Sequence, residues 1–115
     1  DIVAHVATWD AEGLRSLHAF RRGGEYRIPN FVGADDFNGF AASIRMDEPM
    51  AQILADWDAT RKWLRLIVSA MSEDDLSSAM THPSGMRDTA RQLALDLIEH
   101  EEEHLGHIRH ALRTN

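Results

Sequence analysis

Apolar side chains recur every three or four residues in three long stretches of the chain, the spacing of an α-helix with one buried face. The first stretch covers residues 1–22. Its apolar stripe consists of Ile2, Val6, Trp9, Gly13, Leu17 and Phe20. Gly23 and Gly24 then end the predicted helix, because glycine readily adopts the left-handed conformation that follows a helix. Residues 25–33 contain Pro29 and are predicted to form a loop.

The second stretch reaches Met71, and a short helix over residues 35–45 is predicted to precede it. Asp47 is expected to cap the long helix, with Pro49 in its first turn, where a missing N–H costs nothing. The repeating apolar positions are Met50, Ile53, Leu54, Trp57, Leu64, Ile67, Val68 and Met71. This pattern predicts a second helix with one buried face.

The last long helix is predicted from Thr89 to Arg113, and Thr89 with Gln92 forms a capping-box pattern. Residues 72–80 are predicted to form a turn with one short helical piece, and residues 81–85 a loop. No strand is predicted. Three helices of similar length, each roughly 33–38 Å, favour an all-α, up-down helical bundle that forms one domain over residues 1–115.

Charge and composition narrow the classes of partner. The net charge is −7 and the basic residues are scattered, so neither nucleic acid nor an anionic membrane is expected as a partner. No apolar run is long enough for a membrane span. The chain has no cysteine, which excludes disulfides and thiolate ligands and suits a cytoplasmic location. Any metal site must therefore use histidine, aspartate or glutamate.

Four of the seven histidines lie in the segment HEEEHLGHIRH, residues 100–110. His100 and His104 are four residues apart on the predicted last helix, so both imidazoles can bind one ion. His5 occupies a similar position at the edge of the apolar stripe of the first helix. Together the three side chains predict an open metal site for Zn²⁺, Ni²⁺ or Fe²⁺, because neutral imidazole nitrogens suit these ions.

Two carboxylates lie near these histidines in the sequence. Asp96 is one turn before His100 and is expected to accept the second ring N–H of that histidine. Glu101 falls near the centre of the apolar arc, where an unpaired carboxylate is costly. A polar partner or a catalytic role would explain this position, and so would a bundle end that is open to water. The alternative for the whole segment is a solvated helix end, with His107 and His110 as surface residues near the negative end of the helix dipole.

The segment also matches the H-E-x-x-H pattern of zinc proteases, with Glu101 as the base. The longer protease motif needs a glycine three residues after the second histidine, and that position holds His107. Helical periodicity continues through Ile108, so His110 stays on the same helix and cannot turn back to the ion. A protease is therefore not predicted.

Three segments resemble the DinB/YfiT-like metalloprotein superfamily. They are DIVAHVATWD in the first helix, ADDFNGFAA in the connection, and HPSGMRDTARQLALDLIEHEEEHLGHIRHAL at the end. The order and spacing of these motifs carry the resemblance, which extends over essentially the whole chain. The chain departs from the family at two positions. Relatives often have histidine where this chain has Asp96. Relatives also frequently have a tryptophan after the Pro/Gly loop, which this chain lacks, and Met86 is the residue nearest to that position.

The resemblance implies a four-helix bundle in which His5, His100 and His104 bind Zn²⁺ or Ni²⁺. It also implies that a further helix precedes Asp1, or that two copies of the chain complete the bundle as a homodimer. Because the family contains bacillithiol- and mycothiol-dependent S-transferases, a mycothiol-dependent maleylpyruvate isomerase and some hydrolases, the resemblance implies a small metal-dependent transferase or hydrolase. A low-molecular-weight thiol is the expected cosubstrate, with Glu101 and Asp96 as residues that handle protons. The alternative is a non-catalytic bundle that binds metal or a ligand, or mediates dimerisation.

Overall fold

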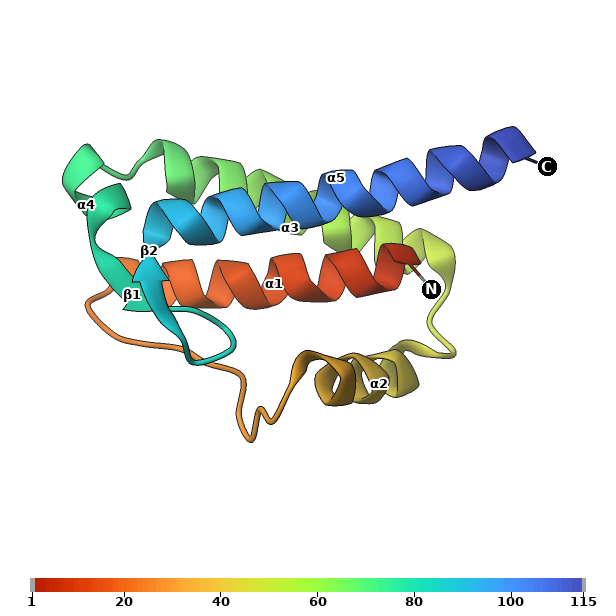
Figure 1. Cartoon of the computed structure of the whole chain (residues 1–115), viewed down its shortest axis with the longest axis horizontal. Helices are drawn as coiled ribbons and strands as arrows, with labels where there is room; N and C mark the ends of the chain where they lie inside the picture. Colours follow the sequence, from red (N-terminus) through yellow and green to blue (C-terminus); the bar gives the residue numbers. More distant parts are fainter. Residues whose placement is uncertain (1, 115) are drawn as a thin grey trace.

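The computed structural model describes the backbone of residues 2–114 and the side chains of residues 2–106 and of His110. It is mostly helical, as Figure 1 shows. The elements are α1 (Ile2–Arg21), α2 (Ala34–Arg45), α3 (Met50–Ser69), α4 (Glu73–Ser77), β1 (Ala79–Thr81), β2 (Arg87–Thr89) and α5 (Ala90–Thr114). The predicted all-α helical bundle is confirmed.

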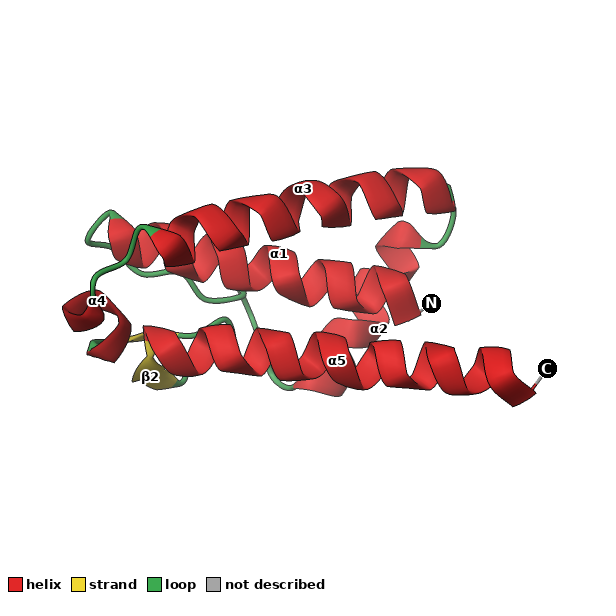
Figure 2. Cartoon of the chain, turned by 90° about the horizontal axis from the view of Figure 1, so that it is seen from above, coloured by secondary structure: helices red, strands yellow, loops and turns green. Residues whose placement is uncertain are grey.

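Helix α1 lies at the centre of the arrangement. It packs against both α3 and α5, and Figure 2 shows it between them. Helix α2 covers the opposite side of α1 and returns the chain to the end where α1 began, so α1 and α3 run in the same direction and α5 runs against them (Figure 1). Helices α3 and α5 therefore flank a groove whose floor is α1.

The buried core forms two clusters along α1. The larger one, near the hairpin, contains Leu17, Met71, Met80, Ala90 and Leu93. The smaller one contains Ala4, Ala7 and Ile53. Between them α1 approaches α5 closely, because a Cβ added to Gly13 would lie 2.6 Å from the Cδ1 atom of Leu97. This close contact brings the first turns of α1 next to the second half of α5.

The short antiparallel hairpin β1–β2 was not predicted, because strands of three residues are too short to show alternation. The turn between the strands contains Gly85 at φ +92°, a conformation that favours glycine. The His82 amide donates to the Met86 carbonyl at 2.8 Å. The side chain of His82 is buried, with Nε2 3.0 Å from the Thr89 carbonyl oxygen. His82 thus holds the hairpin closed.

The predictions of helix starts have mixed outcomes. The hydroxyl of Thr89 accepts from the Gln92 amide at 3.0 Å, as the capping pattern predicts. The Asp47 cap is wrong, because α3 begins after Pro49 and the cap position has no side-chain hydrogen bond. Pro49 is extended, with ψ 141°, so it stands before the helix rather than in its first turn. Asp47 is consequently too far upstream to reach the first free amides.

Among the described residues, no helix combines the length and the apolar character that a membrane crossing requires.

Candidate metal centre

The three predicted histidines meet between α1 and α5. Nε2 of His5 lies 2.9 Å from Nε2 of His100, and Nε2 of His104 lies 3.1 Å from that same atom. The rings are mutually edge-on, with centroids 4.6 to 4.9 Å apart. The helical spacing of His100 and His104 and the close packing of the two helices thus direct three imidazole nitrogens at one point.

The donor set and its geometry fit a metal ion. One ligand atom from each of the three side chains lies within 4.8 Å of the other two. Nitrogens that share a tetrahedral ion at about 2.0–2.1 Å lie roughly 3.3 Å apart, close to the separations of 2.9 and 3.1 Å in the structure. Three protein ligands leave coordination positions open for water or substrate. The cluster therefore fits a metal-binding protein with an open site.

The surroundings keep these imidazoles in the form that binds metal. Burial lowers the pKa of His5 and of His100, and the positive charge that His104 can carry lowers both further. Glu103 opposes this effect at His100 and is the smaller influence. Since only the unprotonated nitrogen can coordinate an ion, both residues are available as ligands at neutral pH.

Two cavities reach His5, and one of them also reaches His100. One, of about 620 Å³, and another, of about 390 Å³, both include His5 and Asn38 in their walls. The indole N–H of Trp9 donates to the Asn38 carboxamide oxygen at 2.6 Å. Trp9 also packs edge-on against Phe37. Asn38 is thereby fixed, and its amide N–H₂ is the group that it can offer to a ligand beside His5.

Asp96 lines the smaller cavity together with His100. Its carboxylate is exposed and accepts from the Gln92 side chain at 2.7 Å. The predicted hydrogen bond from the His100 ring to Asp96 is not among those of the described residues. Gln92 is one helical turn before Asp96 and reaches the carboxylate first. Asp96 therefore stands at the mouth of the cavity and does not support the imidazole.

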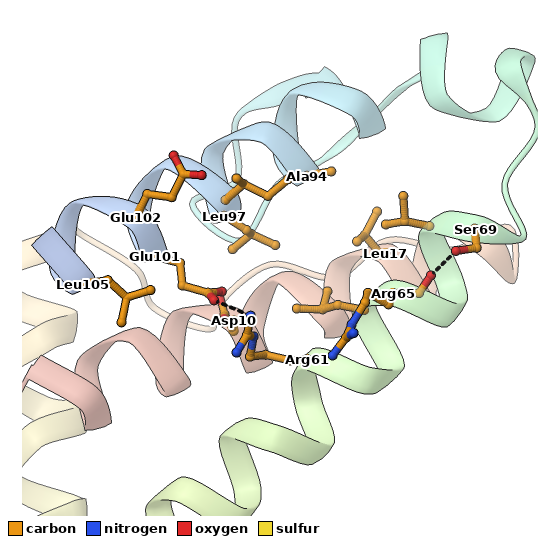
Figure 3. Close-up of a pocket in the computed structure, with 13 residues that line it drawn as sticks. Asp10, Leu17, Arg61, Arg65, Ser69, Ala94, Leu97, Glu101, Glu102 and Leu105 are labelled. Atoms are coloured by element: carbon orange, nitrogen blue, oxygen red, sulfur yellow. Dashed lines mark hydrogen bonds and ion pairs between the residues drawn. The ribbon is translucent and has the colours of Figure 1, made fainter.

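Glu101 faces a different cavity, in the groove between α3 and α5 (Figure 3). Its carboxylate pairs with the Arg61 guanidinium at 2.9 Å, so a polar partner is the explanation of its apolar position that the structure favours. None of the three histidines lines this cavity. The adjacent residues His100 and Glu101 thus line separate cavities.

Asp10 was not predicted as a site residue, although its position four residues after Val6 places it on the buried face of the first helix. It is only 1% exposed, and the Trp57 indole N–H donates to its Oδ2 at 2.8 Å. Burial raises the pKa of Asp10 to about 7, against the opposing effect of the Trp57 hydrogen bond. The charge on the neighbouring Glu101 adds to the increase.

The other histidines lie away from the cluster or outside the described side chains. His18 and His110 are exposed, in agreement with the surface position expected for His110. The side chain of His107 is outside the described residues. His82 lines the smaller cavity with Asn38, but its ring nitrogen is engaged with the hairpin.

A comparison with protein families supports the resemblance found in the motifs. The family model of the DinB superfamily matches residues 1–108. The chain belongs to the DinB superfamily. No curated protein and no solved structure matches the chain. The family and the three-histidine cluster together fit a metal-binding DinB-like protein.

Proposed function

We propose that this DinB superfamily protein is a small metal-dependent enzyme in which His5, His100 and His104 bind one Zn²⁺ or Ni²⁺ ion. The convergence of the three Nε2 atoms, with two separations of 2.9 and 3.1 Å, is the observation that carries the proposal. When bound, the ion would polarise a substrate oxygen or sulfur, or lower the pKa of a water molecule. The two adjoining cavities support access for a small substrate and a second reactant.

Within this class we favour transfer to a low-molecular-weight thiol, with hydrolysis as the second candidate. In the transfer, the thiol sulfur forms a bond to an electrophilic carbon of the substrate, and the leaving group departs with its bonding electrons. The thiol proton passes to a base at the cavity mouth, and exposed Asp96 is suited to this role. The amide N–H₂ of Asn38, held by Trp9, donates to a substrate oxygen beside His5.

Glu101 remains a predicted participant in proton transfer, but its ion pair with Arg61 favours a role in the groove. Asp96 is accordingly the first carboxylate to test. Asp96→Asn retains the hydrogen-bonding shape of the side chain and removes the base. Loss of turnover with unchanged metal content would identify Asp96 as the base, whereas unchanged turnover would exclude it.

The activity is tested by incubating the Zn²⁺- or Ni²⁺-loaded protein with panels of electrophiles, each with bacillithiol, mycothiol or water as acceptor. His104→Ala should abolish turnover because it removes one ligand, and His110→Ala is the matched control on an exposed histidine of the same helix. Metal binding without turnover under any of these conditions would favour the non-catalytic metal-binding bundle. Equal turnover in both variants would contradict the three-histidine site.

We also propose that the protein forms a homodimer. Trp63 and Leu66, on the outer face of α3, are 62% and 61% exposed and lie together in one surface cavity. Contiguous exposed apolar side chains mark protein interfaces. Sedimentation equilibrium should therefore give a dimer mass, and Leu66→Glu should give a monomer. A monomer mass for the unaltered protein would exclude this proposal.

A further inference from the structure

His82 directly follows β1 and is buried, with only 7% of the residue exposed. It nonetheless lines the cavity of about 390 Å³ that also reaches His5 and His100. Buried polar atoms normally have hydrogen-bond partners. The partners of its two ring nitrogens therefore indicate what this side chain can do in the cavity.

The two ring nitrogens of His82 differ in their contacts. Nε2 lies 3.0 Å from the carbonyl oxygen of Thr89, and because a carbonyl oxygen only accepts, Nε2 carries the proton of the neutral ring. Nδ1 consequently presents a lone pair. Among the described residues no group donates to Nδ1, and this atom is not fully enclosed by them. The lone pair is thus available to a molecule in the cavity.

Backbone contacts hold the ring of His82 in this orientation. The His82 amide donates to the Met86 carbonyl, and the His82 carbonyl accepts from the Gly85 amide, both at 2.8 Å. The carbonyl of Pro83 accepts from the Ile28 amide at 2.8 Å, which ties the hairpin to the loop after α1. Together with the Nε2 contact, these hydrogen bonds fix the place and the tautomer of the imidazole before a ligand binds.

Apart from His5 and His100, two side chains in the walls of this cavity can take up a proton, His82 and Asp96. The Asp96 carboxylate is exposed and accepts from the Gln92 side chain. Imidazole is a stronger base than a carboxylate in water, and it is the side chain that most often accepts protons in catalysis. The enclosed histidine is therefore better suited than the exposed carboxylate to accept the first proton.

We propose that His82 is the inner proton acceptor of the site, a role that rests on the enzyme proposed above. The S–H bond of the thiol breaks, its proton moves to Nδ1 of His82, and the sulfur keeps the bonding pair for its attack on the electrophilic carbon. The ring then carries a positive charge, and its Nε2–H continues to donate to the Thr89 carbonyl. Nδ1 finally releases the proton to Asp96 or to water at the mouth of the cavity.

The first test follows the ring nitrogens of His82 by nitrogen-15 nuclear magnetic resonance in the Zn²⁺-loaded full chain at about pH 8, where free imidazole is unprotonated. His82→Gln assigns the signals. The ring should show the neutral Nε2–H form, and 2-mercaptoethanol should move the Nδ1 signal to the position of a protonated nitrogen. A thioether of similar size, 2-(methylthio)ethanol, has no S–H proton and should leave the signal unchanged.

The second test measures turnover and metal content in variants. The side-chain N–H₂ of glutamine can take the place of Nε2–H, so His82→Gln can keep the contact with Thr89 while it removes the lone pair of Nδ1. It should lower turnover about 100-fold, with unchanged metal content and unchanged circular dichroism. His18→Gln, on an exposed histidine of α1, is the matched control and should keep full turnover.

The outcomes separate this role from the proposed function. An Nδ1 signal that does not respond to the thiol, or full turnover in a folded His82→Gln variant, would overturn the role of His82 and leave the metal-dependent reaction intact. An unaltered chain that retains no ion and shows no turnover would remove the proposed function and the role of His82 with it.

Discussion

Replacement of Asp10 by asparagine should stabilise the protein above neutral pH, although it removes a buried charged group. Asparagine keeps the oxygen that accepts from Trp57. Its N–H₂ group can also donate to the Glu101 carboxylate, which pairs with Arg61 in the unaltered protein. The variant therefore removes a buried negative charge and leaves no oxygen of residue 10 without a donor.

The magnitude follows from the pKa of Asp10, which is about 7 in the fold against an ordinary value of 3.8. Between these values the folded state holds a proton that the unfolded chain has lost, so the free energy of unfolding falls as pH rises, by up to about 1.4 kcal/mol per pH unit. At pH 8 the charged carboxylate of Asp10 thus lowers the free energy of unfolding by about 4 kcal/mol at most. Water entering the open groove reduces this cost, and a gain of about 1–3 kcal/mol in Asp10→Asn is expected.

The assay is urea unfolding of the metal-free chain at pH 5 and pH 8, followed by far-ultraviolet circular dichroism. The difference in the free energy of unfolding between Asp10→Asn and the unaltered protein reports on residue 10 alone, because the histidines titrate in both proteins. It should be about 1–3 kcal/mol larger at pH 8 than at pH 5. A variant that is less stable at pH 8, or a difference that is independent of pH, would refute the reasoning.

Three further substitutions test the packing and the site. Gly13→Val should destabilise the fold by about 1–3 kcal/mol in chemical unfolding, because its side chain would displace Leu97 at the contact of α1 and α5; no loss would contradict that close contact. Thr89→Ala should cost about 1 kcal/mol through loss of the α5 cap, measured in the same way, and unchanged stability would show the cap to be dispensable. Asn38→Ala should leave metal content unchanged but weaken acetohydroxamate binding to the Co²⁺-loaded protein about tenfold in visible spectra, whereas equal binding would exclude a contact from its amide.

The helices could be predicted because each carries a periodic apolar face over several turns. The spacing of His100 and His104 also fixes their relation on one helix, whatever surrounds them. The position of His5 next to them depends on how α1 packs on α5. The sequence indicated it through the place of His5 at the edge of the apolar stripe, and the family resemblance supported it. Local patterns thus carried the predictions as far as the contacts within single helices.

The remaining features depend on contacts distant in the sequence. The environment of Asp10 is created by Trp57 and Glu101, which lie on two other helices. Asn38 gains its position from Trp9, 29 residues earlier. For Asp96, by contrast, a local contact decides the outcome. The side chain of Gln92, one turn earlier on the same helix, donates to its carboxylate, and the predicted donor was the imidazole of His100.

The most direct test of the metal centre is the metal content of the purified chain and of His104→Ala, by elemental mass spectrometry after loading with Zn²⁺ or Ni²⁺ and gel filtration. His110→Ala, on the exposed part of the same helix, is the control. About one ion per chain is expected for the unaltered protein and the control, with loss in His104→Ala, because three ligands are needed for an open site of this kind. No retained ion in the unaltered chain, or equal retention in His104→Ala, would contradict a metal centre built from His5, His100 and His104.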